Sequence, residues 1–184
     1  MLDAIQNLDF QILDWIRANL TAPALDPVMV FFHYLGSAAT WIVLCAILLI
    51  LKKTRKEGFV IGCGLLSGVL VANVILKPLV RRARPCWLRP ELAFAITPPS
   101  DYSFPSGHTM AATIFMTIMI KKHPKSAFVL IPFNLLIMFS RLYLYVHFPS
   151  DVLFSLVVGT ILGLLTCYME KRCNARLKAL NLSN

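Results

Sequence analysis

A histidine and an aspartate, His147 and Asp151, lie four positions apart at the end of the segment SRLYLYVHFPSD, residues 140–151. Near the start of a helix, this spacing allows the carboxylate to accept the N–H of one imidazole nitrogen. The second ring nitrogen is then free to act as a nucleophile. The pair therefore predicts a nucleophilic histidine with its own orienting acid.

A second polar segment, FPSGH at residues 104–108, stands directly before an apolar run. If a helix begins there, Ser106 and Gly107 present backbone N–H groups that have no partner within the helix. Such groups and the helix dipole favour an anion, and glycine lets the backbone approach that anion closely. We interpret the segment as an anion cradle, with His108 on its rim to protonate a leaving oxygen.

Cations form the third group. Lys77, Arg81 and Arg84 are spaced i, i+4, i+7, so a helical turn would place them on one face. Arg141 stands in the same segment as the histidine–aspartate pair. Arginine forks and a lysine ammonium bind phosphate and similar oxyanions. Because these bases collect with two histidines at one end of the apolar runs, they indicate a functional site.

Together these residues support phosphoryl transfer, in which His147 attacks phosphorus, His108 serves as the acid and the cations hold the phosphate. The sequence has no further cluster of carboxylates that could hold Mg²⁺. We therefore predict metal-free chemistry through a phosphohistidine, with no cofactor. Each motif alone has a structural explanation, and only their combination indicates a site.

The composition places these residues in a membrane protein. Of the 184 residues, 58% are hydrophobic and only 15% are charged, against about a quarter charged in soluble domains. The net charge of +9 would suit nucleic acid only on a soluble face, but the bases cluster at the ends of apolar runs. We exclude a nucleic-acid partner and expect a single membrane domain over residues 1–184.

Five apolar segments approach the length of about 20 residues that a spanning helix needs. They are residues 27–51, 58–76, 104–120, 127–146 and 150–169. Residues 1–20 instead gather apolar side chains on one stripe, which predicts an amphipathic helix lying on the membrane. The polar tail from Glu170 to Asn184 predicts a short frayed helix.

Lysine and arginine are enriched in the cytoplasmic loops of membrane proteins. The basic segments 52–57 and 121–125 and the basic tail therefore belong in the cytoplasm, which puts the N-terminus and the candidate site outside. The loop 77–103 breaks this rule, because it carries five bases although it should face outward. Those bases must have another role.

Several polar or small residues are interpreted as structural. His33 lies inside the first span, apart from the candidate site, and is expected to be a packed polar residue. Asn73 and Asn134 are expected to hydrogen-bond between helices. The five cysteines show no metal-type spacing and are expected to be free thiols. Two small-xxx-small pairs predict close helix packing: Gly64 with Gly68, and Gly159 with Gly163.

The three motifs resemble those of the type 2 phosphatidic acid phosphatase (PAP2) superfamily. The K-x6-R-P motif matches residues 77–85, PSGH matches 105–108 and S-R-x5-H-x3-D matches 140–151, with no departure at any position. The resemblance implies an all-α, polytopic membrane helix bundle. It also implies roles: phosphate binding by Lys77, Arg84 and Arg141, further hydrogen bonds from Ser106 and Gly107, a His147 nucleophile oriented by Asp151, and His108 as general acid and later base.

A small, membrane-bound, outward-facing member of this family resembles the bacterial enzymes that dephosphorylate undecaprenyl diphosphate, the carrier lipid of the cell wall. We therefore expect a cell-membrane lipid phosphatase that produces undecaprenyl phosphate, with its oligomeric state left open. A phosphatidylglycerophosphate or phosphatidate phosphatase is the alternative, and a lipid phosphotransferase would use the same site. A non-enzymatic lipid or anion transporter is disfavoured, because it has no need for His108, His147 and Asp151 together.

Overall fold

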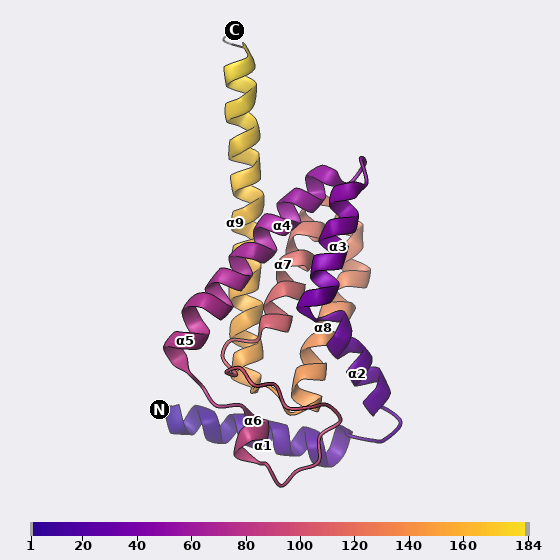
Figure 1. The fold of residues 1–184 in the computed structure, drawn as a ribbon, viewed down its shortest axis with the longest axis vertical. Coiled ribbons are helices and arrows are strands. Elements are labelled where there is room, and N and C mark those ends of the chain that lie inside the picture. Colours follow the sequence, from indigo (N-terminus) through magenta and orange to yellow (C-terminus); the bar gives the residue numbers. More distant parts are fainter. Residues whose placement is uncertain (1, 183–184) are drawn as a thin grey trace.

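The computed structural model describes residues 2–182, which form helices and no β-strand. Figure 1 shows an elongated bundle with the long helix α9, Pro149–Leu182, along its length. The C-terminal part of α9 projects beyond the bundle, and α1, Leu2–Leu20, lies across the opposite end. This arrangement confirms the all-α membrane bundle.

The elements between these two helices follow in chain order. They are α2 (Asp26–Leu35), α3 (Ala38–Ile50), α4 (Arg55–Val69), the π-helical segment η1 (Leu70–Leu76), α5 (Lys77–Val80), α6 (Pro85–Leu88), α7 (Gly107–Lys122), the 3₁₀ turn η2 (Pro124–Ser126) and α8 (Ala127–Tyr143). The predicted first span is thus two helices, α2 and α3, which meet at 50°. Ser37 begins the second of them, because its side chain accepts the backbone N–H of Thr40.

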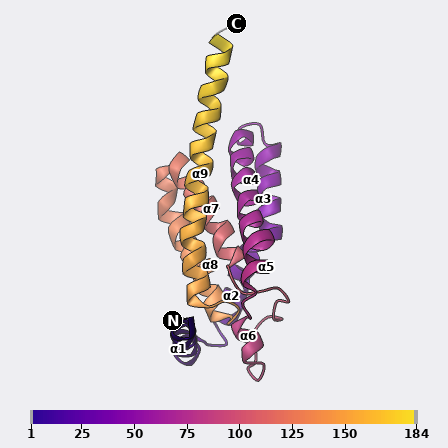
Figure 2. The ribbon, with the colours of Figure 1, turned by 90° about the vertical axis from the view of Figure 1, so that its left-hand side faces the viewer.

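Three stretches within residues 2–182 are long and apolar enough to cross a membrane, and the bent pair α2–α3 makes a fourth if it crosses as one span. The three stretches are Arg55–Leu88, Pro124–Tyr143 and Pro149–Leu180. The third predicted span, α7, has 16 residues, fewer than the roughly 20 of a typical span. It is nevertheless the centre of the bundle, since it packs against α4, α8 and α9 (Figure 2).

The predicted helix in the tail is confirmed up to Leu182, but it is longer than a short tail helix because it is the end of α9. Helix α9 continues without a break from the membrane segment to Leu182. No proline or glycine interrupts the chain after Gly163, so nothing in the sequence ends the helix there.

Glycines bring the outer helices close to α7. A Cβ added to Gly64 or Gly68 of α4 would lie 2.8 or 2.6 Å from an isoleucine side chain of α7. A Cβ added to Gly163 of α9 would lie 2.7 Å from the Cβ of Thr117, and one added to Gly159 would lie 3.0 Å from α7 atoms. Because no larger residue fits without displacement, both predicted small-residue pairs are confirmed as packing sites.

Helix α1 is held to the bundle by one apolar flank. Leu13 is fully buried in a cluster with Tyr145 and Phe148, which belong to the turn between α8 and α9. Leu8 and Trp15 remain more than half exposed, at 57% and 58%. The helix therefore packs on the turn that carries the candidate nucleophile and still offers apolar side chains to a membrane surface.

Candidate active site

The polar segments of the sequence meet at the end of the bundle where α1 lies, opposite the C-terminus (Figure 1). They surround one cavity of about 1680 Å³. Six of the predicted site residues line it: Lys77, Arg84, Gly107, His108, Arg141 and His147. Residues from three separate stretches of the chain are thus brought to one space.

The other two predicted residues, Ser106 and Asp151, are fully buried beside the cavity. Helix α7 begins at Gly107, as predicted, with Ser106 at its N-cap. The backbone N–H of Ser106 donates to Ser155 Oγ at 2.8 Å, and its Oγ accepts from Thr109 at 3.1 Å. The serine is therefore bound within the bundle, while the glycine faces the open cavity.

The expected helical face of Lys77, Arg81 and Arg84 was wrong. Helix α5 ends before Arg81, which has a left-handed backbone with φ of 50°. Arg84 is extended, with φ of −80° and ψ of 150°, because it precedes Pro85 and a residue before proline is disfavoured in a helix. Lys77 and Arg84 converge instead because both bind Asp101, in the loop before α7.

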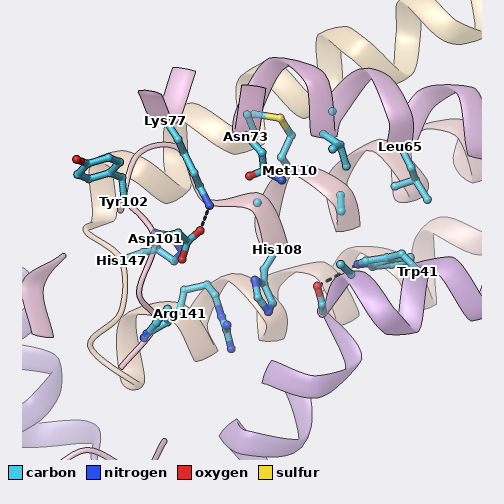
Figure 3. A pocket seen from close by; sticks show the side chains of 18 of the residues that line it. Trp41, Leu65, Asn73, Lys77, Asp101, Tyr102, His108, Met110, Arg141 and His147 are labelled. Carbon is cyan, nitrogen blue, oxygen red and sulfur yellow. Dashed lines mark hydrogen bonds and ion pairs between the residues drawn. The ribbon is translucent and has the colours of Figure 1, made fainter. Parts of the chain in front are cut away.

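Asp101, which sequence reasoning missed, bridges the two cations, and Figure 3 shows its contact with Lys77. Its carboxylate accepts from the Lys77 ammonium and, at 2.7 Å, from Arg84 Nη2, and its carbonyl accepts from Arg84 Nε at 2.6 Å. Burial alone would raise the pKa of Asp101, but hydrogen bonds and charge from Lys77 and Arg84 outweigh it and lower the pKa to about 2. A carboxylate thus lies between the two cations that the sequence predicts to bind an oxyanion.

His147 lies in the turn before α9 and is 2% exposed. Its Nε2 is 3.2 Å from Arg84 Nη1, and because a guanidinium only donates, Nε2 must accept. The proton of the neutral ring then belongs on Nδ1, which faces Asp151 Oδ2 at 3.7 Å. Burial, helped by the charge of Arg84 and opposed by Asp151, lowers the pKa of His147 to about 4. In the neutral ring Nε2 is therefore unprotonated, as a nucleophile requires, and its lone pair accepts from Arg84 in this structure.

Asp151 is itself held by a set of donors. One carboxylate oxygen accepts from Ser103 Oγ at 2.5 Å and from the backbone N–H of Phe148 at 3.0 Å. The other accepts from Arg82 Nη1 at 2.5 Å. A contact of Ser103 or Arg82 with Asp151 was not predicted. For Ser103, the only local signal was its position three residues before Ser106 of the motif.

His108 and Arg141 complete the wall of the cavity. His108 is half-buried, and its buried Nε2 atom has no hydrogen-bond partner among the described residues. The Arg141 guanidinium donates to Ser140 Oγ at 2.9 Å and lies 2.7 Å from Nδ1 of His33. The rings of His33 and His108 stack with centroids 5.1 Å apart. The expectation that His33 lies apart from the site was therefore wrong.

The five bases of the outward loop have partners that explain their presence. Arg82 pairs with Asp9, and Arg89 reaches Asp14 at 3.5 Å, so both bind carboxylates of α1. Lys77 and Arg84 share Asp101, as described above. Arg81 donates to the carbonyl of Pro78. Most of the positive charge that breaks the loop rule is therefore neutralised by nearby acids.

The cavity changes character along its length. Figure 3 shows the charged residues Lys77 and Asp101 at one end and Trp41 and Leu65 at the other. The lining continues along α3 and α4 as far as Leu49 and Gly62.

The five cysteines are free thiols, as predicted. Within residues 2–182, no group of three or more His, Cys, Asp or Glu side chains is arranged to hold a metal ion.

Comparisons with known proteins agree with this geometry. Residues 57–175 match the PAP2 superfamily. An undecaprenyl-diphosphatase of Sulfolobus acidocaldarius is 31% identical over 170 residues, covering 90% of this chain and 81% of that protein. Undecaprenyl-diphosphatase BcrC of Bacillus subtilis is 34% identical over 142 residues, covering 77% of this chain and 72% of that protein. A solved transmembrane PAP2 type phosphatidylglycerolphosphate phosphatase of Bacillus subtilis superposes with a TM-score of 0.77 at 26% identity, covering 92% of this chain and 87% of that one.

Proposed function

This chain belongs to the PAP2 superfamily, and from that premise we propose that it is a membrane lipid phosphatase that converts undecaprenyl diphosphate to undecaprenyl phosphate. The observation that carries the proposal is the two-part cavity, which joins a cationic pocket around His147 to an apolar groove between α3 and α4. A phosphate head requires the first part and a long hydrocarbon tail requires the second. Two relatives named undecaprenyl-diphosphatase support the choice of this lipid.

The proposed reaction begins when the terminal phosphate binds among Lys77, Arg84 and Arg141, with the backbone of Gly107 on a further side. The Nε2 of His147 attacks phosphorus, and the bond between phosphorus and the bridging oxygen breaks. His108 gives a proton to that oxygen, so lipid monophosphate leaves. The fixed cations stabilise the charge that develops on the transferred phosphoryl group.

The second step regenerates the enzyme. His108, now unprotonated, takes a proton from a water molecule, and the resulting hydroxide attacks the phosphorus of the phosphohistidine. The bond from phosphorus to Nε2 of His147 breaks, and inorganic phosphate is released. Asp151 holds the Nδ1 proton throughout and stabilises the positive charge on the phosphorylated ring. Ser106 is fixed at the start of α7 by its hydrogen bonds with Ser155 and Thr109, next to Gly107 in the pocket.

The proposal also covers sidedness. The site and α1 lie at one end of the bundle, and the basic segments 52–57 and 121–125 lie at the other end with the C-terminus (Figure 1). The positive-inside rule favours a cytoplasmic location for those basic segments. We therefore infer a cell-membrane protein with an extracytoplasmic active site and a cytoplasmic C-terminus.

Phosphate release by the detergent-purified protein tests the proposal. Undecaprenyl diphosphate, phosphatidylglycerophosphate and phosphatidate are offered separately to the wild type and to His147→Ala. We expect fastest release from undecaprenyl diphosphate and none from the variant. His123→Ala is the matched control, because this half-exposed histidine contacts Glu57 at the opposite end of the bundle.

Other outcomes point elsewhere. Faster release from phosphatidylglycerophosphate would replace the substrate by that of the solved Bacillus relative. Release only when an acceptor lipid is added would identify a phosphotransferase. Undiminished release by His147→Ala would refute the histidine mechanism, whichever lipid is used.

A further inference from the structure

A buried ionic cluster lies behind the candidate nucleophile, on the side away from the cavity. At its centre, the Arg82 guanidinium lies over the ring of Phe148 at 3.9 Å. Its Nη1 donates to Asp151 at 2.5 Å and to Ser150 Oγ at 2.8 Å, and its Nη2 donates to Asp9 at 2.7 Å. One arginine therefore connects α1 to the first turn of α9.

Asp9 is the other half of this connection. It is only 3% exposed, although it belongs to a helix that lies across the end of the bundle. Besides Arg82, its carboxylate accepts the backbone N–H of Ser150 at 2.9 Å and the hydroxyl of Ser150 at 2.5 Å. Ser150 directly precedes Asp151, so Asp9 fixes the backbone from which Asp151 projects.

The charges in the cluster explain why Asp9 is needed. Arg82 touches the carboxylate that faces His147, and alone it would cancel the negative charge of Asp151. Asp9 contacts the same guanidinium, so the cluster of Arg82, Asp9 and Asp151 keeps one net negative charge. That charge is required, because Asp151 must hold the Nδ1 proton of His147 while the ring becomes a cation. A buried charge also costs stability unless it is paired, so removing Asp9 leaves Arg82 competing with His147 for Asp151.

We propose that Asp9 of α1 is a positioning residue of the active site, which acts through Arg82 and Ser150 to hold Asp151 against His147. The proposal rests on the phosphohistidine function described above. It gives one residue of the N-terminal helix a supporting role in the active site, since Asp9 supplies the carboxylate that balances Arg82. Asp9 itself touches neither the cavity nor the substrate.

Asp9→Asn tests the proposal, because it keeps the shape and removes the charge. We expect kcat to fall by about tenfold to 100-fold, the size of effect that a misplaced catalytic group causes. KM should change little, since the phosphate pocket is untouched. The substrate is whichever lipid the wild type hydrolyses fastest, with phosphate release as the readout.

Asp14→Asn is the matched control. Asp14 is on the same helix and also fixes it to the bundle, by accepting from Tyr145 Oη at 2.6 Å and from Arg89. It does not contact Asp151. If α1 acted only as a structural brace, the two variants would lose kcat in proportion to their loss of thermal stability. We expect Asp14→Asn to keep kcat at an equal or larger loss of melting temperature.

The double variant Asp9→Asn with Arg82→Gln separates charge from packing. Its second change removes the unbalanced guanidinium, so we expect kcat no lower than in Asp9→Asn alone, whereas independent structural damage would multiply. If Asp9→Asn does not fold, Ser150→Ala carries the test, because it removes one contact to Asp9 and one to Arg82 without changing charge. A lower kcat at constant KM supports the proposal.

Unchanged kcat in folded Asp9→Asn, or in Ser150→Ala if the former does not fold, overturns the proposal. A kcat of the double variant below that of Asp9→Asn also overturns the proposal. These outcomes are distinct from a failure of the proposed function, which would appear as an inactive wild type or an active His147→Ala.

Discussion

Asp101 occupies the place where the phosphate of a substrate is expected to bind, so replacing it should tighten substrate binding. Its carboxylate pairs with Lys77 and Arg84, and the side chain is 52% exposed. An incoming phosphate must compete with this carboxylate for the same donors and approach against its negative charge. Asp101→Asn removes both obstacles and keeps the side-chain size.

The magnitude follows from the pKa of Asp101, which Lys77 and Arg84 lower from 3.8 to about 2 despite the opposing effect of burial. A shift of this size corresponds to about 2 kcal/mol when unscreened, and half exposure to solvent reduces it to about 1 kcal/mol. Releasing that contact should lower KM about fivefold. The same contact stabilises the fold, so the free energy of unfolding should fall by about 1 kcal/mol.

The sign of the pH dependence is fixed as well. Because the folded-state pKa of Asp101 lies below the unfolded value, its contribution to stability is present above about pH 4 and is lost as the pH falls through about 2. The carboxylate is therefore ionised throughout the neutral range. The ratio of KM between wild type and Asp101→Asn should be constant from about pH 5 to pH 8.

The assay measures KM for the preferred lipid and the inhibition constant of orthovanadate, a phosphate-like oxyanion. Both should fall together in Asp101→Asn. Glu91→Gln is the control, because Glu91 is an exposed carboxylate of the same loop, and its loss tests whether charge alone matters. A rise of both constants in Asp101→Asn would refute the reasoning and show that Asp101 organises the two cations instead of competing for them.

Three further predictions concern packing, the second histidine and metal ions. Gly163→Ala should destabilise the protein by about 1–3 kcal/mol, because its Cβ would lie 2.7 Å from Thr117. Gly62→Ala has open space around its Cβ and should not destabilise the protein. Thermal unfolding in detergent distinguishes the two variants. His33→Ala should raise KM about tenfold, because the Arg141 guanidinium loses its hydrogen bond with His33. An unchanged KM would contradict a role of His33 in phosphate binding. EDTA should leave phosphate release unaffected, since lysine and arginine neutralise the phosphate; inhibition that Mg²⁺ reverses would contradict the metal-free mechanism.

Residues whose role depends on local chain geometry could be predicted from the sequence. A serine and a glycine after Pro105 signal a helix start, and the structure begins α7 at Gly107 with Ser106 as its N-cap. The spacing of His147 and Asp151 similarly brought the two side chains to face each other. In both cases the residues involved are within one helical turn, so no other part of the chain decides their separation.

The expected helical face of the first motif failed although a local signal against it was present. Pro85 disfavours a helical backbone at Arg84, so a continuous helix through residues 77–84 was already unfavourable. The left-handed backbone of Arg81 had no such signal, because this conformation is uncommon for residues other than glycine. The convergence of Lys77 and Arg84 comes from Asp101, a partner 17 residues away from Arg84 that no periodicity reveals.

The contacts of Asp9 and His33 could not be predicted from the sequence either, because their partners are distant along the chain. Arg82 lies 73 positions from Asp9, and Arg141 lies 108 positions from His33, so only the packing of α1 and α2 against the end of the bundle creates these pairs. The sequence did contain one indirect indication, the excess of bases in a loop that should face outward. A base that faces outward, against the positive-inside rule, needs a partner that balances its charge. Buried carboxylates are such partners.

This pairing has a consequence for how the site keeps its charge. Arg82 is neutralised by Asp9 and Asp151, whereas Lys77 and Arg84 share the half-exposed Asp101, and Arg141 bonds Ser140 and His33. The cluster behind His147 is thus left with negative charge, and the cavity in front of it with positive charge. In the proposed reaction, the phosphate would enter on the positive side, and the imidazolium formed during transfer would be stabilised from the negative side. A histidine nucleophile would benefit from positive charge near Nε2, where the phosphate arrives, and from negative charge near Nδ1. Helix α1 supplies the acid that preserves the negative charge on the second side.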